Sequence, residues 1–310
     1  MRSTRLGRSV LGSCVAVAIL AGCGASQPPI GAPGAMPQSR ATKNQALLYV
    51  VASNGHVNFV TYPGGKKVGS IDFGLYSYLT AACSDRSGNV WIVNYGALDK
   101  YAYGSTKAIR IKSLPFGVAG CASDLASNDL AAVGQGGVGV IRNERGKANV
   151  YHTKSYYKLR FCGYDASGDL FVDGVHAYNG SAIFLELPSG SSKLVKLTLG
   201  KKVGEPGQIQ WDGHYVAIQD RKKPYDIYQV SFSGNKGTVV NTVTFTGLRK
   251  PVMPSWIQGA TAIVPYSQRG KFSDAAGFFN YPAGGAAIKV LSGRTYLYAV
   301  AVTITPASSP

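Results

Sequence analysis

Basic and aromatic side chains are the residues of this sequence best suited to do chemistry, and that chemistry is the binding of anions. The chain carries 32 lysines and arginines against 15 aspartates and glutamates, a formal net charge of +17. Positive charge attracts anionic polymers over a long range, and exposed rings stack on sugar faces or bases. The sequence therefore predicts an anionic partner; the alternative is a solvated basic surface without one.

These side chains concentrate in the longer connections between the expected strands. The candidate ligand-binding residues there are Tyr95, Tyr156, Tyr157, Lys201, Lys202, Lys222, Lys223, Tyr225 and Lys250. Further cations and rings of the same connections are Lys100, Lys154, Lys158, Arg160, Arg221, Phe116, Tyr178 and Tyr266. Short turns at the opposite strand ends carry fewer cations, chiefly Lys66, Lys67, Lys107, Lys147, Lys193 and Lys236.

No catalytic motif stands out. The sequence has no Gly-x-Ser-x-Gly elbow, no glycine-rich phosphate loop followed by Lys-Ser or Lys-Thr, and no His-Glu-x-x-His pair. Its four histidines, His56, His152, His176 and His214, are scattered along the chain. The sequence thus predicts no catalytic nucleophile or base, and an enzyme is the less favoured interpretation.

Three cysteines, Cys83, Cys121 and Cys162, each fall near the end of an expected inner strand. No Cys-x-x-Cys or His-x-x-x-His spacing accompanies them, so a metal site is weakly indicated. The favoured interpretation is that they pack as small apolar side chains at a crowded hub. A disulfide between two neighbours is the alternative in an oxidising compartment.

The elements that position these residues come from a hairpin that the chain repeats six times. It occupies 60–68 and recurs at 100–109, 140–150, 185–195, 230–239 and 279–288. An apolar segment precedes each copy, starting near Leu47, Val90, Leu130, Leu170, Tyr215 and Ala262, at intervals of 40 to 47 residues. That period is typical of a propeller or a solenoid. A short segment before most of these runs, such as 79–83 before Asp85-Arg86-Ser87-Gly88, completes a unit of four strands.

The repeat predicts an all-β protein, a six-bladed β-propeller with four-stranded blades over residues 46–304. We name the strands of each blade a to d from the inside out. The first blade has no a strand upstream of residue 47, whereas 296–303 is similar to the a strand at 78–83. The C-terminal strand should therefore complete the first blade and close the ring. Thirty-nine glycines and the lack of a sustained 3.6-residue apolar period predict almost no helix.

A ring of this kind has two unlike faces. We call the side with the b-to-c and d-to-a connections the loop face, and the side with the a-to-b and c-to-d turns the turn face. The candidate ligand-binding residues belong to the loop face, where long connections can vary without disturbing the core. Asn94, Asp173 and Asp220 are expected there just after b strands, and Glu205 just before an a strand.

The N-terminus predicts an export signal. Arg2, Arg5 and Arg8 precede an apolar run, and Leu20-Ala21-Gly22-Cys23 resembles a bacterial lipobox, which implies lipidation of Cys23 after removal of a signal peptide at 1–22. An ordinary signal peptide with an incidental cysteine is the alternative. Residues 23–45 are expected to be a lipid-anchored flexible linker, and 305–310 a disordered tail. The mature protein is thus expected on the periplasmic or cell-surface side of a membrane. Nucleic acid would also suit the positive charge, but this location argues against it as the partner.

The repeat resembles the six-bladed β-propeller superfamily that includes NHL-repeat proteins and gluconolactonase-like enzymes. Gly204-Glu205-Pro206-Gly207, followed by Trp211-Asp212, is similar to a Glu-Gly-Pro and Trp segment of the lactonases. It departs from that segment by falling in the fifth repeat and by having proline and glycine transposed. In the lactonases such a glutamate joins asparagine and aspartate side chains around one divalent cation. The resemblance therefore implies a cation such as calcium held by Glu205, Asn94, Asp173 and Asp220.

Two functions from different classes follow. The favoured one is a non-enzymatic, lipid-anchored binding or scaffold propeller without a cofactor, for an anionic glycan, another envelope polymer or a protein. The alternative is a divalent-cation-dependent, lactonase-like hydrolase. Convergence of the four oxygen ligands at the mouth of the channel would favour the enzyme.

Overall fold

The computed structural model describes residues 45–303 apart from 76, 271 and 294–295. The signal peptide predicted at 1–22, the tail at 305–310 and all but the last residue of the linker at 23–45 lie outside the described residues. The domain limits and the lipidation of Cys23 therefore stay predictions.

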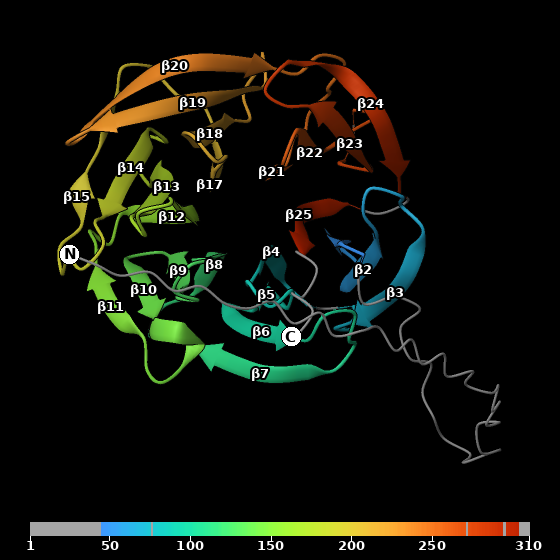
Figure 1. The fold of residues 1–310 in the computed structure, drawn as a ribbon, viewed down its shortest axis with the longest axis horizontal. Coiled ribbons are helices and arrows are strands. Elements are labelled where there is room, and N and C mark those ends of the chain that lie inside the picture. The colour runs from blue at the N-terminus through green and yellow to red at the C-terminus, as the bar shows by residue number, and fades with distance from the viewer. Residues whose placement is uncertain (1–44, 76, 271, 294–295, 304–310) are drawn as a thin grey trace, which may run out of the picture. The chain divides into compact units, whose positions relative to one another are not determined.

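The described residues form six sheets arranged as blades around a central channel (Figure 1). From the channel outward, blade 1 consists of β25 (Leu297–Thr303), β1 (Leu47–Ala52), β2 (His56–Thr61) and β3 (Lys67–Asp72), and blade 2 of β4 (Leu79–Ser84), β5 (Val90–Asn94), β6 (Ala97–Tyr101) and β7 (Ala108–Ser113). Blade 3 consists of β8 (Val118–Ser123), β9 (Leu130–Gly134), β10 (Gly137–Ile141) and β11 (Asn149–His152), and blade 4 of β12 (Tyr157–Tyr164), β13 (Leu170–His176), β14 (Ala182–Leu187) and β15 (Val195–Lys196). Blade 5 consists of β17 (Pro206–Trp211), β18 (Val216–Asp220), β19 (Asp226–Ser233), β20 (Lys236–Thr244) and β16 (Thr198–Leu199), and blade 6 of β21 (Trp256–Gln258), β22 (Thr261–Tyr266), β23 (Ala275–Asn280) and β24 (Gly284–Ser292).

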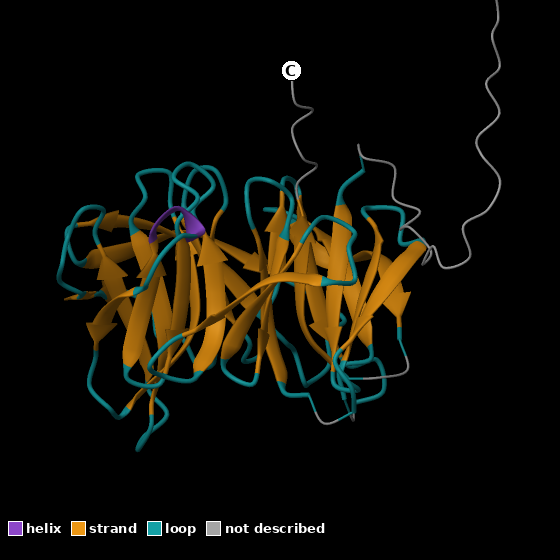
Figure 2. Ribbon diagram, turned by 90° about the horizontal axis from the view of Figure 1, so that it is seen from below, coloured by secondary structure: helices purple, strands orange, loops and turns teal. Residues whose placement is uncertain are grey.

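The predicted all-β, six-bladed β-propeller is confirmed, and so is its closure. β25 pairs antiparallel with β1, with Leu47 opposite Thr303, and the Leu47 N–H donates to Thr303 Oγ1 over 3.2 Å. Among the described residues the one helix is the 3-10 turn η1 (Arg142–Glu144). Figure 2 shows the ring from the side, with η1 on the turn face, which is uppermost there. No helix in the described part of the chain is long and apolar enough to cross a membrane.

Blade 5 departs from the four-strand prediction, because β16 pairs parallel with the outer edge of β20. The segment that follows β15 carries Leu197, which is buried in the core between blades 4 and 5, and Leu199, which packs against that core. Burial of these two leucines draws the segment across the outer edge of the blade before it returns to the channel.

The hydrophobic core is divided into six clusters, one at each contact between neighbouring blades. Side chains alternate along each strand, so one set packs against the preceding blade and the other against the following blade. Four inner strands, β4, β8, β12 and β17, are followed directly by Asp85, Asp124, Asp165 and Asp212, whose Oδ1 atoms accept backbone N–H groups two residues further on, at 2.8 to 2.9 Å. These aspartates are therefore turn formers.

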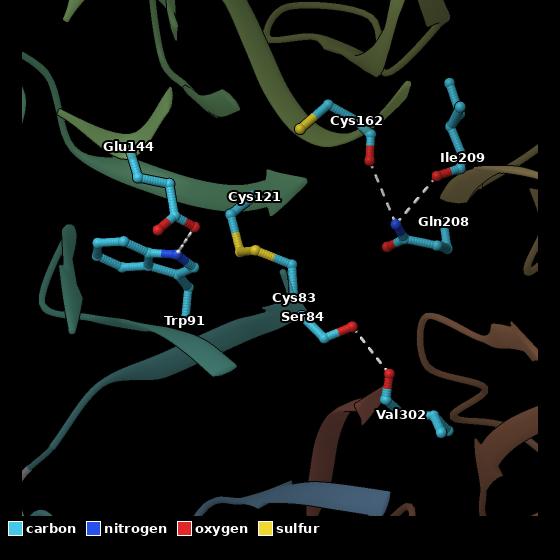
Figure 3. Close-up of a disulfide and its surroundings, with 9 residues drawn as sticks. All are labelled: Cys83, Ser84, Trp91, Cys121, Glu144, Cys162, Gln208, Ile209 and Val302. Carbon is cyan, nitrogen blue, oxygen red and sulfur yellow. Dashed lines mark hydrogen bonds between the residues drawn. A yellow bond between two sulfur atoms is a disulfide. The ribbon is translucent and has the colours of Figure 1, made fainter. Parts of the chain in front are cut away.

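A disulfide joins Cys83 of β4 to Cys121 of β8, with their Cα atoms 5.8 Å apart (Figure 3). The favoured expectation of three unpaired cysteines is thus wrong for these two, and the disulfide alternative is right. Cys83 lies two residues before its turn aspartate and Cys121 three residues before its own, so the side chains point toward each other across the contact of blades 2 and 3. Cys162 is also three residues before its aspartate, but it faces blade 3, where Ala122 occupies the corresponding place, and it stays a buried free thiol as expected.

A buried ion-pair network also joins blades 2 and 3. Lys100 Nζ lies 2.7 Å from Asp85 Oδ2 and contacts Glu144 Oε2, while Trp91 Nε1 donates to Glu144 Oε1 over 2.7 Å. Glu144 has a left-handed φ of 53°, which turns its side chain inward from η1. The prediction that Lys100 is a loop-face cation is therefore wrong: it lies in β6, is 7% exposed and compensates two buried carboxylates.

Candidate functional site

Four rings gather on the loop face of blade 4, and we call Tyr156, Tyr157, His176 and Tyr178 the tyrosine cluster. The ring centroid of Tyr156 lies 4.6 Å from that of His176, 5.1 Å from that of Tyr157 and 5.9 Å from that of Tyr178. Lys154 Nζ lies 5.6 Å from the centroid of Tyr156. Tyr178 is 84% exposed, so the cluster presents aromatic surface to solvent.

Two connections position the tyrosine cluster. Tyr157, the first residue of β12, pairs with His176, the last residue of β13. The Ala177 N–H donates to the carbonyl of Tyr156 over 2.8 Å, which ties the connection after β13 to the one before β12. In the loop after β13, Asn179 Oδ1 accepts the Ser181 N–H over 3.0 Å. The rings therefore stand on backbone that is fixed by hydrogen bonds, which lowers the entropy cost of binding.

Further exposed cations lie at blade 4, at a loop and the outer edge of blade 5, where Lys201 and Lys202 follow β16, and in the connection from blade 5 to blade 6. We call the following side chains the basic arc: Lys154, Lys158, Lys201, Lys202, Lys222, Lys223 and Lys250. All are exposed, and five of them are predicted site residues. Lys201 Nζ lies 5.5 Å from the ring centroid of Tyr228, and Lys250 Nζ lies 3.0 Å from Glu205 Oε2. The arc therefore carries a large excess of positive charge.

Two predicted aromatic residues lie elsewhere. Tyr225 is 7% exposed and packs in the core between blades 5 and 6, so the expectation of an exposed ring is wrong. Its backbone has a left-handed φ of 73° and its N–H donates to the Lys222 carbonyl, a tight turn that folds the ring inward. Tyr266 is buried in the same core. Tyr95 is 64% exposed as expected, but it lies on blade 2, and blade 3 separates it from the tyrosine cluster.

Two carboxylates of the predicted cation site, those of Glu205 and Asp220, are engaged by other groups. Glu205 Oε1 lies 3.2 Å from Arg221 Nη2, and its Oε2 contacts Lys250. Asp220 ends β18, where its Oδ2 accepts the Gly204 N–H over 2.7 Å and its Oδ1 accepts the N–H groups of Glu205 and Lys222 over 2.9 Å. Each negative charge thus already has hydrogen-bond or ionic partners from blade 5 or the adjoining connections.

The other two candidate ligands lie apart from this pair. Asp173 does not follow its strand as expected but is the fourth residue of β13; it is fully buried, and neither carboxyl oxygen has a hydrogen-bond partner among the described residues. Burial raises the pKa of Asp173 well above its usual value, against the opposing charges of Arg221 and Arg160. Asn94 ends β5 on blade 2. The structure thus brings Glu205 and Asp220 together in and beside blade 5. Asp173 lies in the neighbouring blade, and Asn94 lies three blades away. Within the described ranges, no group of three or more His, Cys, Asp or Glu side chains is arranged to hold a metal ion.

A cavity of about 550 Å³ lies at the turn-face end of the channel. All six inner strands line it, and the disulfide and Gln208 of Figure 3 belong to this lining. The sequence did not lead us to predict this cavity, because the candidate ligand-binding residues were all placed in the connections between strands. The available signal was the concentration of glutamine and tryptophan residues in two inner strands, Gln208-Ile209-Gln210-Trp211 and Trp256-Ile257-Gln258.

The sequence matches no family model and no curated protein. Its fold is similar to that of a protein of unknown function from Bacteroides caccae (TM-score 0.62, 10% identity, covering 84% of this chain and 99% of that chain). It is also similar to a chain of a nidogen/laminin complex (TM-score 0.68, 10% identity, covering 84% and 100%) and to the calcium-binding protein regucalcin from Agrobacterium tumefaciens (TM-score 0.53, 16% identity, covering 69% and 74%). At these identities the likenesses concern the fold alone, and they agree with the predicted β-propeller fold.

Proposed function

We propose that the protein is a non-catalytic binding propeller of the cell envelope, held at a membrane by lipid on Cys23, and that its loop face binds an anionic glycan. The tyrosine cluster is the observation that carries this proposal. Its rings lie within 4.6 to 5.9 Å of Tyr156, so they form a continuous aromatic surface, and the basic arc begins beside it at Lys154.

The chemistry of the loop face matches that of an acidic sugar chain. The apolar face of a sugar ring stacks on tyrosine, and carboxylate or phosphate groups of the same chain can pair with lysines. Glu205 is the acidic residue that meets the basic arc, and its contacts with Lys250 and Arg221 leave six lysines of the arc without that neutralising partner. A neutral sugar would use the rings alone and bind more weakly.

The direction of the chain ends supports an accessible loop face. β1 is a b strand and begins at the turn face, opposite the last residue of β25. The chain therefore enters the ring at the turn face, which is the face opposite the loop face. We favour this function over a hydrolase because Glu205 and Asp220 are engaged by cations and backbone N–H groups.

The test uses the mature chain with Cys23→Ser, titrated calorimetrically with polygalacturonate and, as the neutral comparison, dextran. Tyr178→Ala should weaken polygalacturonate binding about fivefold, because an exposed stacking ring contributes about 1 kcal/mol. Tyr78→Ala is the matched control, since Tyr78 is 65% exposed and precedes β4 of blade 2. Equal losses from both substitutions, or equal affinity for dextran and polygalacturonate, would contradict the proposal.

A further inference from the structure

The cavity at the turn-face end of the channel has the size and construction of a small-molecule site. Its volume of about 550 Å³ falls within the usual range of about 300 to 1,000 Å³ for ligand pockets. Its lining comes from the ends of the inner strands and from the turns that follow them, including Ala126 and Ala166. It lies on the opposite side of the ring from the tyrosine cluster, so it is independent of the function proposed above.

Two unlike walls face each other across this cavity. β17 and β21 contribute Gln208, Gln210, Trp211, Trp256 and Gln258, all of them partly exposed. Blades 2 and 3 contribute the disulfide and Ala122, which offer sulfur and methyl surface. A ligand that fits both walls needs one polar edge and one apolar face.

The amides on the polar wall are held in place and still have free hydrogen-bonding capacity. Gln210 is tied to the backbone of β21, since its Nε2 donates to the Ile257 carbonyl over 2.6 Å and its Oε1 accepts the Ile257 N–H over 2.8 Å. Gln208 Nε2 donates to the carbonyls of Cys162 and Ile209, whereas its Oε1 has no partner among the described residues. Gln258 Oε1 accepts from Trp256 Nε1 over 3.3 Å, which leaves the Gln258 NH₂ group to donate. The wall therefore presents one uncharged acceptor and one uncharged donor.

Charge excludes an anion here. The lining contains Asp124, Asp165 and Asp212 but no lysine, arginine or histidine among the residues that the structure describes. An anionic ligand would meet carboxylates in a partly enclosed space, where repulsion is screened less than in water. This selectivity is the reverse of that of the loop face.

We infer that this cavity is a binding site for a neutral saccharide of one or two rings. A pyranose has an apolar face that suits tryptophan or the disulfide wall, and its hydroxyl edge both donates and accepts, as Gln208 and Gln258 require. The amide pair fixes the orientation of the sugar, and the aromatic and sulfur surfaces supply the contact area.

The test is saturation-transfer NMR and calorimetry on the full mature chain with maltose, cellobiose and diacetylchitobiose, with glucuronate as the anionic comparison. Ala166→Trp places an indole at the mouth of the cavity and should weaken saccharide binding at least about tenfold. Ser167→Trp is the matched control, because Ser167 is the next exposed residue of the same turn and does not line the cavity. Ala126→Trp, on the turn of the adjacent blade, repeats the block independently.

We expect at least one neutral disaccharide to bind the wild type, with no change in Ser167→Trp. The inference is overturned if none of the three disaccharides binds, if glucuronate binds as tightly and Ala166→Trp weakens that binding, or if the blocked and control variants bind equally. Thermal melting of each variant confirms that it is folded. Loss of binding in Tyr178→Ala alone would assign the saccharide to the loop face and so refute the cavity site.

Discussion

Removal of the disulfide between blades 2 and 3 should produce a large loss of stability. Cys83 and Cys121 are 38 residues apart in the sequence. A cross-link over a loop of that length lowers the entropy of the unfolded chain enough to contribute about 4 kcal/mol at 25 °C. We therefore expect the double substitution Cys83→Ala with Cys121→Ala to lower the free energy of unfolding by about that amount.

The matched control for this prediction is Cys162→Ala. Cys162 is a buried free thiol in the next blade, so its replacement removes sulfur packing without opening a cross-link. A loss of about 4 kcal/mol in a domain of this size lowers the melting temperature by about 8 to 16 °C. Chemical denaturation followed by tryptophan fluorescence gives the free energy, and circular dichroism gives the melting temperature. If the double variant loses no more than twice what Cys162→Ala loses, the disulfide makes no entropic contribution and the reasoning is refuted.

Four further predictions follow from single contacts or faces. Ala122→Cys should form a second disulfide with Cys162, because this pair occupies the place of the existing one at the next blade contact; thiol titration of the unfolded protein should then detect one free thiol fewer than in the wild type, because Cys162 is free there. Lys100→Met should lower the unfolding free energy by about 3 to 5 kcal/mol, since it leaves two buried carboxylates without their cation; denaturant melts check this, and a loss below 1 kcal/mol would contradict it. Burial raises the pKa of Asp173 in the folded state, so with rising pH the carboxyl loses its proton in the unfolded state before it does so in the folded state, and the free energy of unfolding falls above about pH 4. Asp173→Asn should remove that fall. Denaturant melts at several pH values check this, and an unchanged dependence of the unfolding free energy on pH would contradict it. Replacing Lys201, Lys202, Lys222 and Lys223 together with glutamate should abolish binding of polygalacturonate, whereas replacing Lys66, Lys67, Lys107 and Lys147 with glutamate should preserve it. Affinity electrophoresis measures both variants, and equal losses of binding would indicate diffuse surface charge.

The fold was predictable because its information is local and repeated. β1, β5, β9 and β13 begin at the predicted residues, and β18 and β22 begin within one residue of the predicted starts. Glycine and aspartate turns mark each strand end, and the missing inner strand of blade 1 pointed to the C-terminal segment. Local turn chemistry thus fixes the blade boundaries without knowledge of distant contacts.

The disulfide and the buried lysine could not be predicted in this way. Whether Cys83 meets Cys121 depends on a one-residue offset between two turns, which decides the side of the strand on which each sulfur lies. Lys100 is charged and stands in a run that was expected to be a connection. Its burial requires Glu144, which comes from another blade and from a left-handed backbone conformation.

The candidate sites were predictable in part. Tyr156 and Tyr157 were visible as rings in a basic connection, but their partner rings come from the loop after β13, which the pairing of Tyr157 with His176 brings alongside. The channel cavity combines residues from all six inner strands. Its lining is dispersed over more than two hundred positions, from Cys83 to Val302, so no sequence window contains it.

The pairing of β25 with β1 sets the order in which this molecule can be completed. Of the described strands, β25, which borders the channel in blade 1, is the last to be synthesised, and its neighbour β1 is the first. During synthesis, β1 therefore keeps an unpaired inner edge until residue 303 has been made. A chain interrupted anywhere before that point keeps an unpaired edge beside the channel, which marks it as incomplete to proteases and chaperones. Closure of the ring is thereby a physical check that the whole repeat array has been made.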